Sequence, residues 1–317
     1  MNTPILILIF NRPKETKKLV KRLEKFKPKN IYVFSDGPRK NNFTDIELNN
    51  QCKLLIQNIN WKSKIKKKYL KNNLGCKNAV SRGISWFFKN VKMGIILEDD
   101  CIPTESFFKF CEWGLKKFKN SKKVGTITGN NFLNLKINIK SSYYFSKYAH
   151  CWGWATWRNR WALYNKNITF WKRWKNSKNY RELFNLKHEI LYWKKIFNNV
   201  SKNKIDSWAY PWNLCLWYNN KIVLTPKYNL VKNVGYGNSA THTFVNSDNL
   251  NYDTIKLNYP YKSPQIDKVN MEADNYVFYN HFQGLNYLWP YRMIYVFKLI
   301  LTNPRFVIFK LKRYFNL

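Results

Sequence analysis

Acidic residues are scarce in this sequence. Its 317 residues include 18 Asp and Glu but 56 Lys and Arg, which gives a formal net charge of +38 at pH 7. Lys, Asn and Ile are abundant, as A+T-rich coding produces, but such coding would also supply Asp and Glu. A charge of this size governs partners and association rates rather than the fold. Two interpretations stay open: a compositional bias, and work near an anionic membrane surface, a phosphorylated glycan or lipid, or nucleic acid.

Paired cysteines and long apolar runs are also missing. The six cysteines include no C-x-x-C pair, so neither a zinc site nor a disulfide framework is expected. No stretch approaches the ~20 apolar residues of a membrane-spanning helix, and the apolar run at 5–10 is too short for a signal peptide. We therefore expect a protein of the reducing cytoplasm, with peripheral contact to a membrane as an alternative.

The first 130 residues alternate between strand-like and helix-like patterns. Hydrophobic spacing predicts strands at 4–10, 31–35, 65–70, 94–97 and 124–128, and helices at 14–26, 44–59, 77–89 and 104–118. Such alternation favours an α/β fold with a mostly parallel, twisted sheet that helices flank on both faces.

The remaining sequence is richer in aromatic residues and less regular. Short irregular segments are expected at 143–174, helices at 180–198 and 208–219, strands at 222–224 and 228–231, and a loop at 234–243. We divide the chain into a domain at 1–245, with a first part at 1–130 and a second at 131–245, and a basic, aromatic extension at 246–317. The apolar and basic tail from 291 either lies on an anionic membrane or packs on the domain.

Polar side chains follow three of the predicted strands. Arg12 follows the first, Asp36 the second, and Glu98, Asp99 and Asp100 (the acidic triplet) the fourth. Because ligands of open α/β sheets bind at the carboxyl ends of the strands, these residues predict a site at one edge of the sheet. Arg12 is consistent with a diphosphate contact or a helix entry. Asp36 is consistent with a contact to a base or ribose, or with a turn.

The acidic triplet carries the predicted chemistry. Adjacent carboxylates repel one another unless a cation neutralises them. Hard oxygen ligands suit Mn²⁺ or Mg²⁺, which also take phosphate oxygens as ligands. A solvated acidic turn that caps the next helix is the alternative, but the position directly after a buried strand favours the metal site.

Seven motifs together resemble a bacterial glycosyltransferase family. They are similar to those of the eukaryotic N-glycan N-acetylglucosaminyltransferases that carry a Glu-Asp-Asp motif, and they span roughly 3 to 245. In the letters of this sequence they read NRP at 11–13, SDGP at 35–38, NLGC at 73–76, ILEDD at 96–100, WGWATWR at 152–158, DSWAY at 206–210 and NVGYG at 233–237.

The resemblance implies a GT-A fold, the Rossmann-like fold of nucleotide-diphospho-sugar transferases. It implies an inverting hexosyl- or N-acetylhexosaminyltransferase that takes a nucleotide-sugar donor, with a UDP-sugar expected, and uses Mn²⁺ (or Mg²⁺). Asp100 maps to the direct metal ligand. The donor-binding positions are Arg12, Asp36, Asn73, Glu98, Asp99 and His242, the last in a loop at 235–243 that closes over the donor.

Two residues of the tryptophan-rich motif are further donor-side candidates. Gly153 between two tryptophans indicates a close approach of the backbone to another group, for which the donor sugar is one choice. Trp154 offers an aromatic face of the kind that stacks on sugars, although packing in the core is the commoner role of a tryptophan.

The catalytic base is sought among the acidic residues after 130. There are eight, and only Asp206 lies inside one of the motifs, so it is the candidate for the base of an inverting transfer. Its alternative role is to cap the helix predicted from 208.

Two other functions remain open at this stage. The charge allows a transferase that modifies nucleic acid, as in viral base glycosylation, although no nucleic-acid motif is present. A non-catalytic polyanion-binding module on the same fold is the other, and the intact acidic triplet argues against it. A glycan or a lipid-linked saccharide is the acceptor that we expect.

Overall fold

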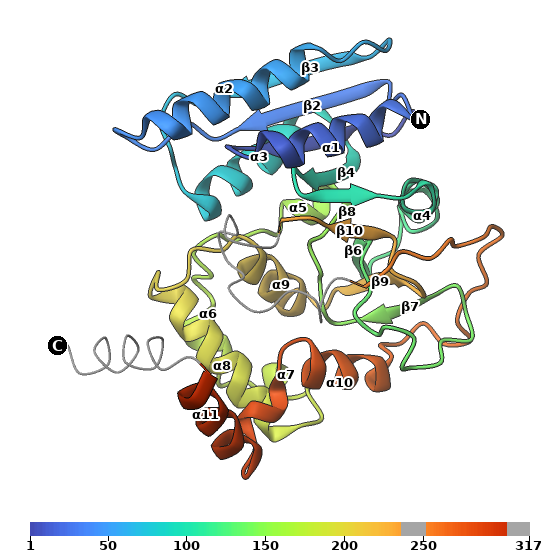
Figure 1. The fold of residues 1–317 in the computed structure, drawn as a ribbon. Coiled ribbons are helices and arrows are strands. Elements are labelled where there is room, and N and C mark those ends of the chain that lie inside the picture. Colours follow the sequence, from blue (N-terminus) through green and yellow to red (C-terminus); the bar gives the residue numbers. More distant parts are fainter. Residues whose placement is uncertain (236–251, 303–317) are drawn as a thin grey trace.

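A computed structural model of the chain describes residues 1–235 and 252–302. In its first part strands and helices alternate (Figure 1). They are β1 (Ile5–Ile9), α1 (Pro13–Glu24), β2 (Asn30–Ser35), α2 (Phe43–Gln57), β3 (Lys64–Tyr69), α3 (Cys76–Asn90), β4 (Met93–Glu98), β5 (Cys101–Pro103), α4 (Glu105–Lys117) and β6 (Val124–Thr128). All nine elements predicted for this part are present within a few residues of the expected bounds, and β5 is additional.

The later part adds β7 (Tyr143–Ser146), β8 (Trp154–Trp157), α5 (Arg158–Trp161), α6 (Trp171–Trp174), α7 (Lys178–Arg181), α8 (Lys187–Ser201), α9 (Ala209–Tyr218), β9 (Ile222–Pro226) and β10 (Val231–Asn233). After the undescribed segment follow α10 (Met271–Asn280), the 3₁₀ helix η2 (Gly284–Tyr287) and α11 (Tyr291–Thr302). No helix in the two described ranges is both long and apolar enough to cross a bilayer.

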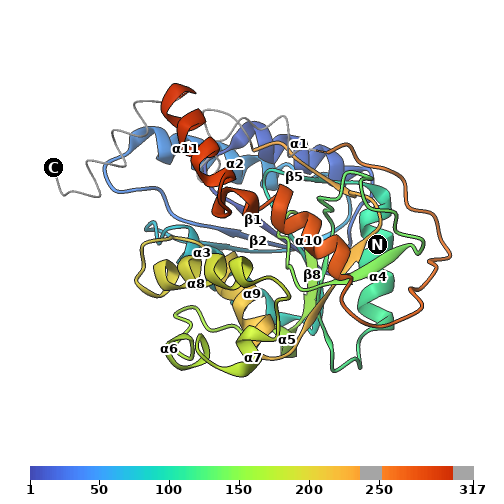
Figure 2. The same cartoon turned by 90° about the horizontal axis from the view of Figure 1, so that it is seen from below.

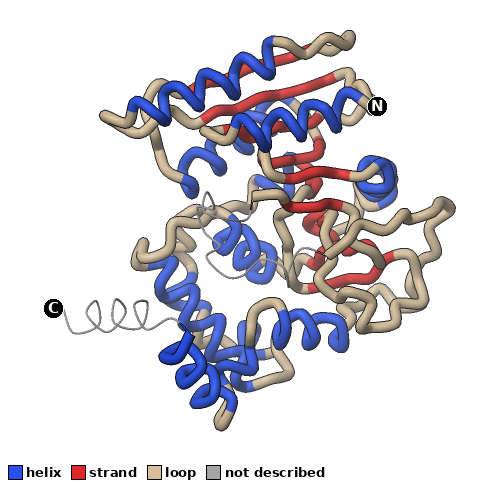
Figure 3. Tube along the Cα trace, in the orientation of Figure 1, coloured by secondary structure: helices blue, strands red, loops and turns tan. Residues whose placement is uncertain are grey.

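The described strands form one eight-stranded sheet in the order β3-β2-β1-β4-β8-β6-β9-β7, and a separate β5–β10 pair. The strands β1, β2, β3 and β4 are parallel to one another, as are β6 and β9. β8 runs antiparallel to both of its neighbours, and β7 is an antiparallel edge strand. The predicted α/β class with a mostly parallel sheet is therefore confirmed, and Figure 3 shows the strands running through the middle of the molecule.

Helices cover both faces of the sheet: in Figure 2, α1 and α2 lie above β1 and β2, and α3, α8 and α9 lie below them. On one face Ile5, Ile7 and Ile9 pack with side chains of α1, α2 and α4. On the other face Leu6 and Leu8 pack with α3, α9 and four buried tryptophans. Since β1 is completely buried, its residues show no polar alternation, which is typical of a central parallel strand.

Several expectations for the later part were wrong. The single helix expected at 180–198 is two helices, α7 and α8, with a break at 182–186 that no Gly or Pro marks. The strand expected at 228–231 begins only at Val231. The segment expected to be irregular contains β7 and β8, and β8 is inserted between β4 and β6 in the main sheet. The parts 1–130 and 131–245 therefore share one sheet.

Residues beyond 245 contribute to the same core. Leu257 and Tyr261 belong to the same buried core as β1 and α4. In α10, Asp274 is fully buried and accepts hydrogen bonds from the Ser146 hydroxyl (2.5 Å) and the Lys147 amide (2.9 Å). In contrast, α11 lies at the end of the molecule far from β3 (Figure 1).

Candidate active site

The carboxyl ends of β1, β2 and β4 meet at one edge of the sheet. β1 lies between the other two, with Ile9 opposite Ser35 and Leu8 opposite Glu98. The residues that follow these strands are Arg12, Asp36 and the acidic triplet, so the topology brings the three predicted groups to a common edge.

Arg12 pairs with two members of the acidic triplet. Its Nη1 lies 2.8 Å from Asp100 Oδ2, and its Nη2 contacts Asp99 Oδ1. Burial opposes the charge of Arg12, but Asp99 and Asp100 outweigh that effect and raise its pKa. The Asp99 side chain is 2% exposed and that of Asp100 is 14% exposed. A ligand therefore reaches Asp100 far more readily than Asp99.

The other two carboxylates of the triplet resist ionisation. Burial raises the pKa of Glu98 and of Asp99, and the neighbouring Asp100 adds to the effect. A hydrogen bond with the Trp208 side chain opposes the shift at Glu98. Such crowding of carboxylates in a partly dry site favours the binding of a positive group.

The predicted donor loop begins directly over Asp100. The Val234 amide donates to the Asp100 carbonyl (2.9 Å), and the Gly235 amide donates to Asn233 Oδ1 (2.8 Å). A Cβ atom on Gly235 would lie 2.2 Å from Asp100 Oδ2, so this close approach requires glycine. The rest of the loop, including His242, lies outside the described residues.

Asp36 and Asn73 organise the neighbouring loops. Asp36 Oδ1 accepts from the Gly37 amide (2.9 Å) and the Leu74 amide (3.0 Å), and Asp36 Oδ2 accepts from Asn73 Nδ2 (2.9 Å). Asn73 Nδ2 also donates to the Gly37 carbonyl (2.8 Å). Burial raises the pKa of Asp36 although these hydrogen bonds oppose it. The two side chains thus connect the β2 edge to the loop that precedes α3.

Asp206 caps a helix, but not the one that follows it in sequence. Its two carboxylate oxygens accept from the amides of Cys76 (3.1 Å) and Lys77 (3.0 Å), the first residues of α3. We expected Asp206 to cap α9 if it capped a helix, but the helix that it caps is α3. The Asp206 side chain nevertheless remains exposed. Burial raises the pKa of the Cys76 thiol, and the charges of Glu98 and Asp206 add to the effect.

The tryptophan-rich motif lies mostly in the core. Trp154 is 2% exposed in β8 and stacks on Trp208 (ring centroids 5.4 Å apart), whose side chain bonds Glu98. Gly153 has a positive φ of 68°, and a Cβ there would meet Val231 and Phe107. The close approach at Gly153 is thus to core side chains, and Trp154 supports the site from behind.

One carboxylate of this edge was not recognised from the sequence. Asp45 in α2 is buried and accepts from Asn11 Nδ2 (2.7 Å) and Arg39 Nη2 (2.7 Å). The hydrogen bond from Arg39 lowers its pKa. Asp45 thereby fixes the loops after β1 and β2. Acidic residues are rare in this sequence, so an Asp in the first turn of a predicted helix could have been recognised as a candidate for a structural role.

The carboxylates at this edge of the sheet can bind a cation together with a ligand. In the parts of the chain that the structure describes, no three His, Cys, Asp or Glu side chains gather closely enough to hold a metal ion by themselves. Mg²⁺ commonly takes only one or two protein carboxylates and completes its shell with water and substrate phosphates. Asp100 fits that arrangement, because its side chain is partly exposed (14%) and lies beside Arg12.

Comparisons with known proteins give little beyond this geometry. No protein family and no curated protein matches the sequence. Among solved structures, one of an active-site mutant of LgtC matches at 10% identity over 59% of this chain and 68% of that chain, with a TM-score of 0.35. The galactosyltransferase LgtC in complex with donor and acceptor sugar analogs matches at 7% identity over 69% and 72%, with a TM-score of 0.37. Similarity at this level identifies neither activity nor substrate.

Proposed function

We propose that this protein is a metal-dependent GT-A glycosyltransferase that moves a sugar from a nucleotide-diphosphate donor to an acceptor hydroxyl. The observation that carries the proposal is Asp100, the accessible carboxylate at a sheet edge where Arg12 and Asp36 also lie. The motif resemblance supports the same function. A UDP-sugar is the proposed donor, and a hexosyl or N-acetylhexosaminyl group is the proposed cargo.

Asp100 would hold Mn²⁺ or Mg²⁺ together with the donor. The cation supplies charge neutralisation for the leaving nucleoside diphosphate. Arg12 already lies within hydrogen-bond distance of Asp100, so its guanidinium is placed to contact the same diphosphate. Asp36 and Asn73 hold the loop that borders the base and ribose side, and Gly235 lets the donor loop approach Asp100.

Asp206 remains our candidate for the base. Its hydrogen bonds with the first amides of α3 fix the carboxylate in place, while the side chain stays exposed. A carboxylate oxygen has two lone pairs, so capping leaves each oxygen able to accept a proton from an acceptor hydroxyl. Attack on the face opposite to the diphosphate would invert the sugar configuration.

We further propose that the enzyme works at an anionic membrane surface on a glycan or lipid-linked acceptor. Trp289 and the apolar residues of α11 are exposed, among them Met293 (63%), Ile294 (60%) and Phe297 (67%). The described part of this tail, 291–302, contacts η2 and leaves most of its apolar side chains exposed. An exposed aromatic and aliphatic helix on a protein of net charge +38 has the properties of an interfacial segment.

The transferase proposal is tested by release of nucleoside diphosphate from a panel of nucleotide sugars with Mn²⁺. Turnover with one donor in the wild type and at least a hundredfold loss in Asp100→Asn are expected. Glu105→Gln, an exposed helix carboxylate, is the matched control and should keep full activity. Turnover that does not depend on Asp100 or on the cation would contradict the proposal.

Flotation with liposomes tests the membrane proposal. We expect the wild type to float with vesicles rich in phosphatidylserine and not with neutral vesicles. Ile294→Glu with Phe297→Glu should abolish flotation. Leu135→Glu changes an equally exposed leucine (63%) on another part of the chain and should leave flotation intact. Flotation that survives the α11 changes would show that bulk charge alone binds the membrane.

A further inference from the structure

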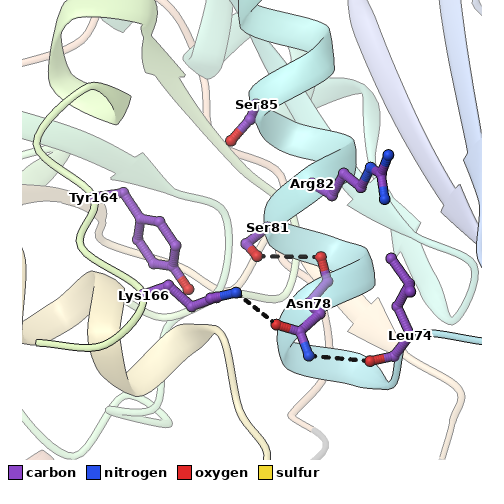
Figure 4. A pocket seen from close by; sticks show the side chains of 7 residues that line it. All are labelled: Leu74, Asn78, Ser81, Arg82, Ser85, Tyr164 and Lys166. Carbon is purple, nitrogen blue, oxygen red and sulfur yellow. Dashed lines mark hydrogen bonds between the residues drawn. The ribbon is translucent and has the colours of Figure 1, made fainter.

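A second cavity lies beside the candidate active site, along the outer face of α3. It has a volume of about 590 Å³ and is open to solvent on one side. Figure 4 shows its lining side chains, which come from α3, from the loop before it and from the segment after α5. They are Leu74, Asn78, Ser81, Arg82, Ser85, Tyr164 and Lys166.

The lining is cationic. It contains Arg82 and Lys166 and no carboxylate. Within residues 1–235 and 252–302, Arg82 forms no hydrogen bond and no ion pair. Lys166 donates from Nζ to Asn78 Oδ1 (2.9 Å), which uses one of its three donors. Both side chains therefore keep unused donors, and in Figure 4 the Arg82 guanidinium points to the opposite side of α3 from the Lys166 ammonium. A guanidinium fits phosphate or carboxylate through two parallel hydrogen bonds.

The neutral part of the lining is built from fixed groups. One face of the Tyr164 ring stacks on Trp161 (4.3 Å between centroids, 11° between planes), which holds the ring in place. Ser85 Oγ accepts from the Trp161 indole (3.0 Å) and keeps its own proton to donate. Asn78 adds amide hydrogen-bonding capacity. A held aromatic ring beside hydroxyl and amide groups suits a sugar ring, which presents both C–H faces and hydroxyls.

We propose that this cavity binds a saccharide that carries a phosphate or carboxylate group. Arg82 and Lys166 bind the anionic group, and Tyr164 packs against the sugar ring. The cavity is distinct from the donor site, because none of its lining residues belongs to the acidic triplet or contacts Asp100. It is also adjacent to that site: the Tyr164 hydroxyl lies 3.4 Å from the carbonyl of Trp208, whose side chain bonds Glu98.

This inference goes beyond the proposed function and does not depend on it. A ligand in the cavity would lie one layer of residues away from the acidic triplet. The site would thus hold a part of an anionic saccharide that is remote from the reacting hydroxyl. In a protein with 56 Lys and Arg, the necessary control is a cation of the same helix that does not line the cavity. Lys89, exposed in the last turn of α3, meets that requirement.

Isothermal titration calorimetry tests the proposal, with EDTA present so that a cation-dependent donor site does not contribute. The ligands are glucose 1-phosphate, glucuronate, inorganic phosphate and methyl glucoside. We expect saturable binding of glucose 1-phosphate or glucuronate to the wild type, and weaker binding of the other two. Arg82→Gln and Lys166→Gln should each weaken it by about tenfold, as loss of a charged hydrogen bond does. Lys89→Gln should leave it unchanged.

The comparison between ligands identifies the anionic group, because preference for glucose 1-phosphate indicates a phosphate site and preference for glucuronate a carboxylate site. Three results would overturn the proposal. The first is that neither glucose 1-phosphate nor glucuronate shows saturable binding. The second is an equal loss in Lys89→Gln and Arg82→Gln, which would assign the binding to overall charge. The third is an equal affinity for inorganic phosphate and for the two anionic sugars, which would show that the cavity does not recognise the sugar ring. Circular dichroism of each variant shows that the fold is retained.

Discussion

Arg12 and Asp100 form an ion pair of 2.8 Å between Nη1 and Oδ2, which joins the ends of β1 and β4 over one edge of the sheet. The same guanidinium contacts Asp99, whose side chain is almost fully buried. One cation thus holds two carboxylates that would otherwise repel each other in a dry environment.

Loss of Arg12 should therefore destabilise the protein. We expect Arg12→Gln to lower the free energy of unfolding by about 3–5 kcal/mol, because it removes the cation that pairs with the buried Asp99 and with Asp100. Urea unfolding at pH 7.5 followed by circular dichroism measures the loss. Lys109→Gln, which removes an exposed ion pair with Glu105, should cause no measurable change. A loss in Arg12→Gln no larger than in this control would mean that the pair does not hold the site together.

The sequence predicted the half of the fold whose elements follow the usual periodicities. The alternation before 130 placed Arg12, Asp36 and the acidic triplet at one edge. It could not predict that Arg12 pairs with Asp99 and Asp100, because their side chains meet only after β1 and β4 become neighbours. β8 was missed for a different reason: all four of its residues are buried, so a tryptophan-rich central strand shows no alternation of polar and apolar residues.

The role of Asp206 shows the limit of local rules. Capping signals are read from residues next to a helix, yet Asp206 caps α3 from 130 residues away. The local rule pointed to the following helix. Only the tertiary fold brings the loop before α9 to the first turn of α3.

The two roles of Asp206 separate in the Asp206→Asn variant. Asn can still accept hydrogen bonds at a helix N-terminus, so the stability should fall by about 1 kcal/mol or less. It cannot take a proton, so kcat should fall by at least about a hundredfold. Asn270→Ala, which removes the cap of α10, should show the reverse pattern of lower stability and unchanged kcat. A variant Asp206→Asn with near wild-type kcat would assign Asp206 to capping alone.

Asp274 should give the protein a pH-dependent stability. Burial raises its pKa to about 6, with Lys147 opposing the shift, against an ordinary value near 4. The folded state therefore holds the proton more tightly than the unfolded state. The stability from this group is complete below about pH 4, declines as the pH rises to about 6, and is then constant.

Asp274→Asn removes that titration. Relative to the variant, the wild type should lose about 3 kcal/mol of unfolding free energy between pH 4 and pH 6, as two units of pKa imply. Urea unfolding at pH 4, 5, 6 and 7 measures the difference. Glu272→Gln, an exposed neighbour in α10, should follow the wild type at every pH. Parallel curves for Asp274→Asn and the wild type would show that folding does not shift the pKa of Asp274.

The central claim is that Asp100 binds a nucleoside diphosphate through a shared divalent cation. Titration calorimetry of UDP, GDP, ADP and CDP into the wild type, with Mn²⁺ and with EDTA, tests it most directly. We predict saturable binding of one nucleotide, UDP first, that requires Mn²⁺, is lost in Asp100→Asn and is retained in Glu105→Gln. Binding of equal strength without the cation and in Asp100→Asn, or no binding of any nucleotide, would contradict the transferase account and leave a protein that binds polyanions by charge.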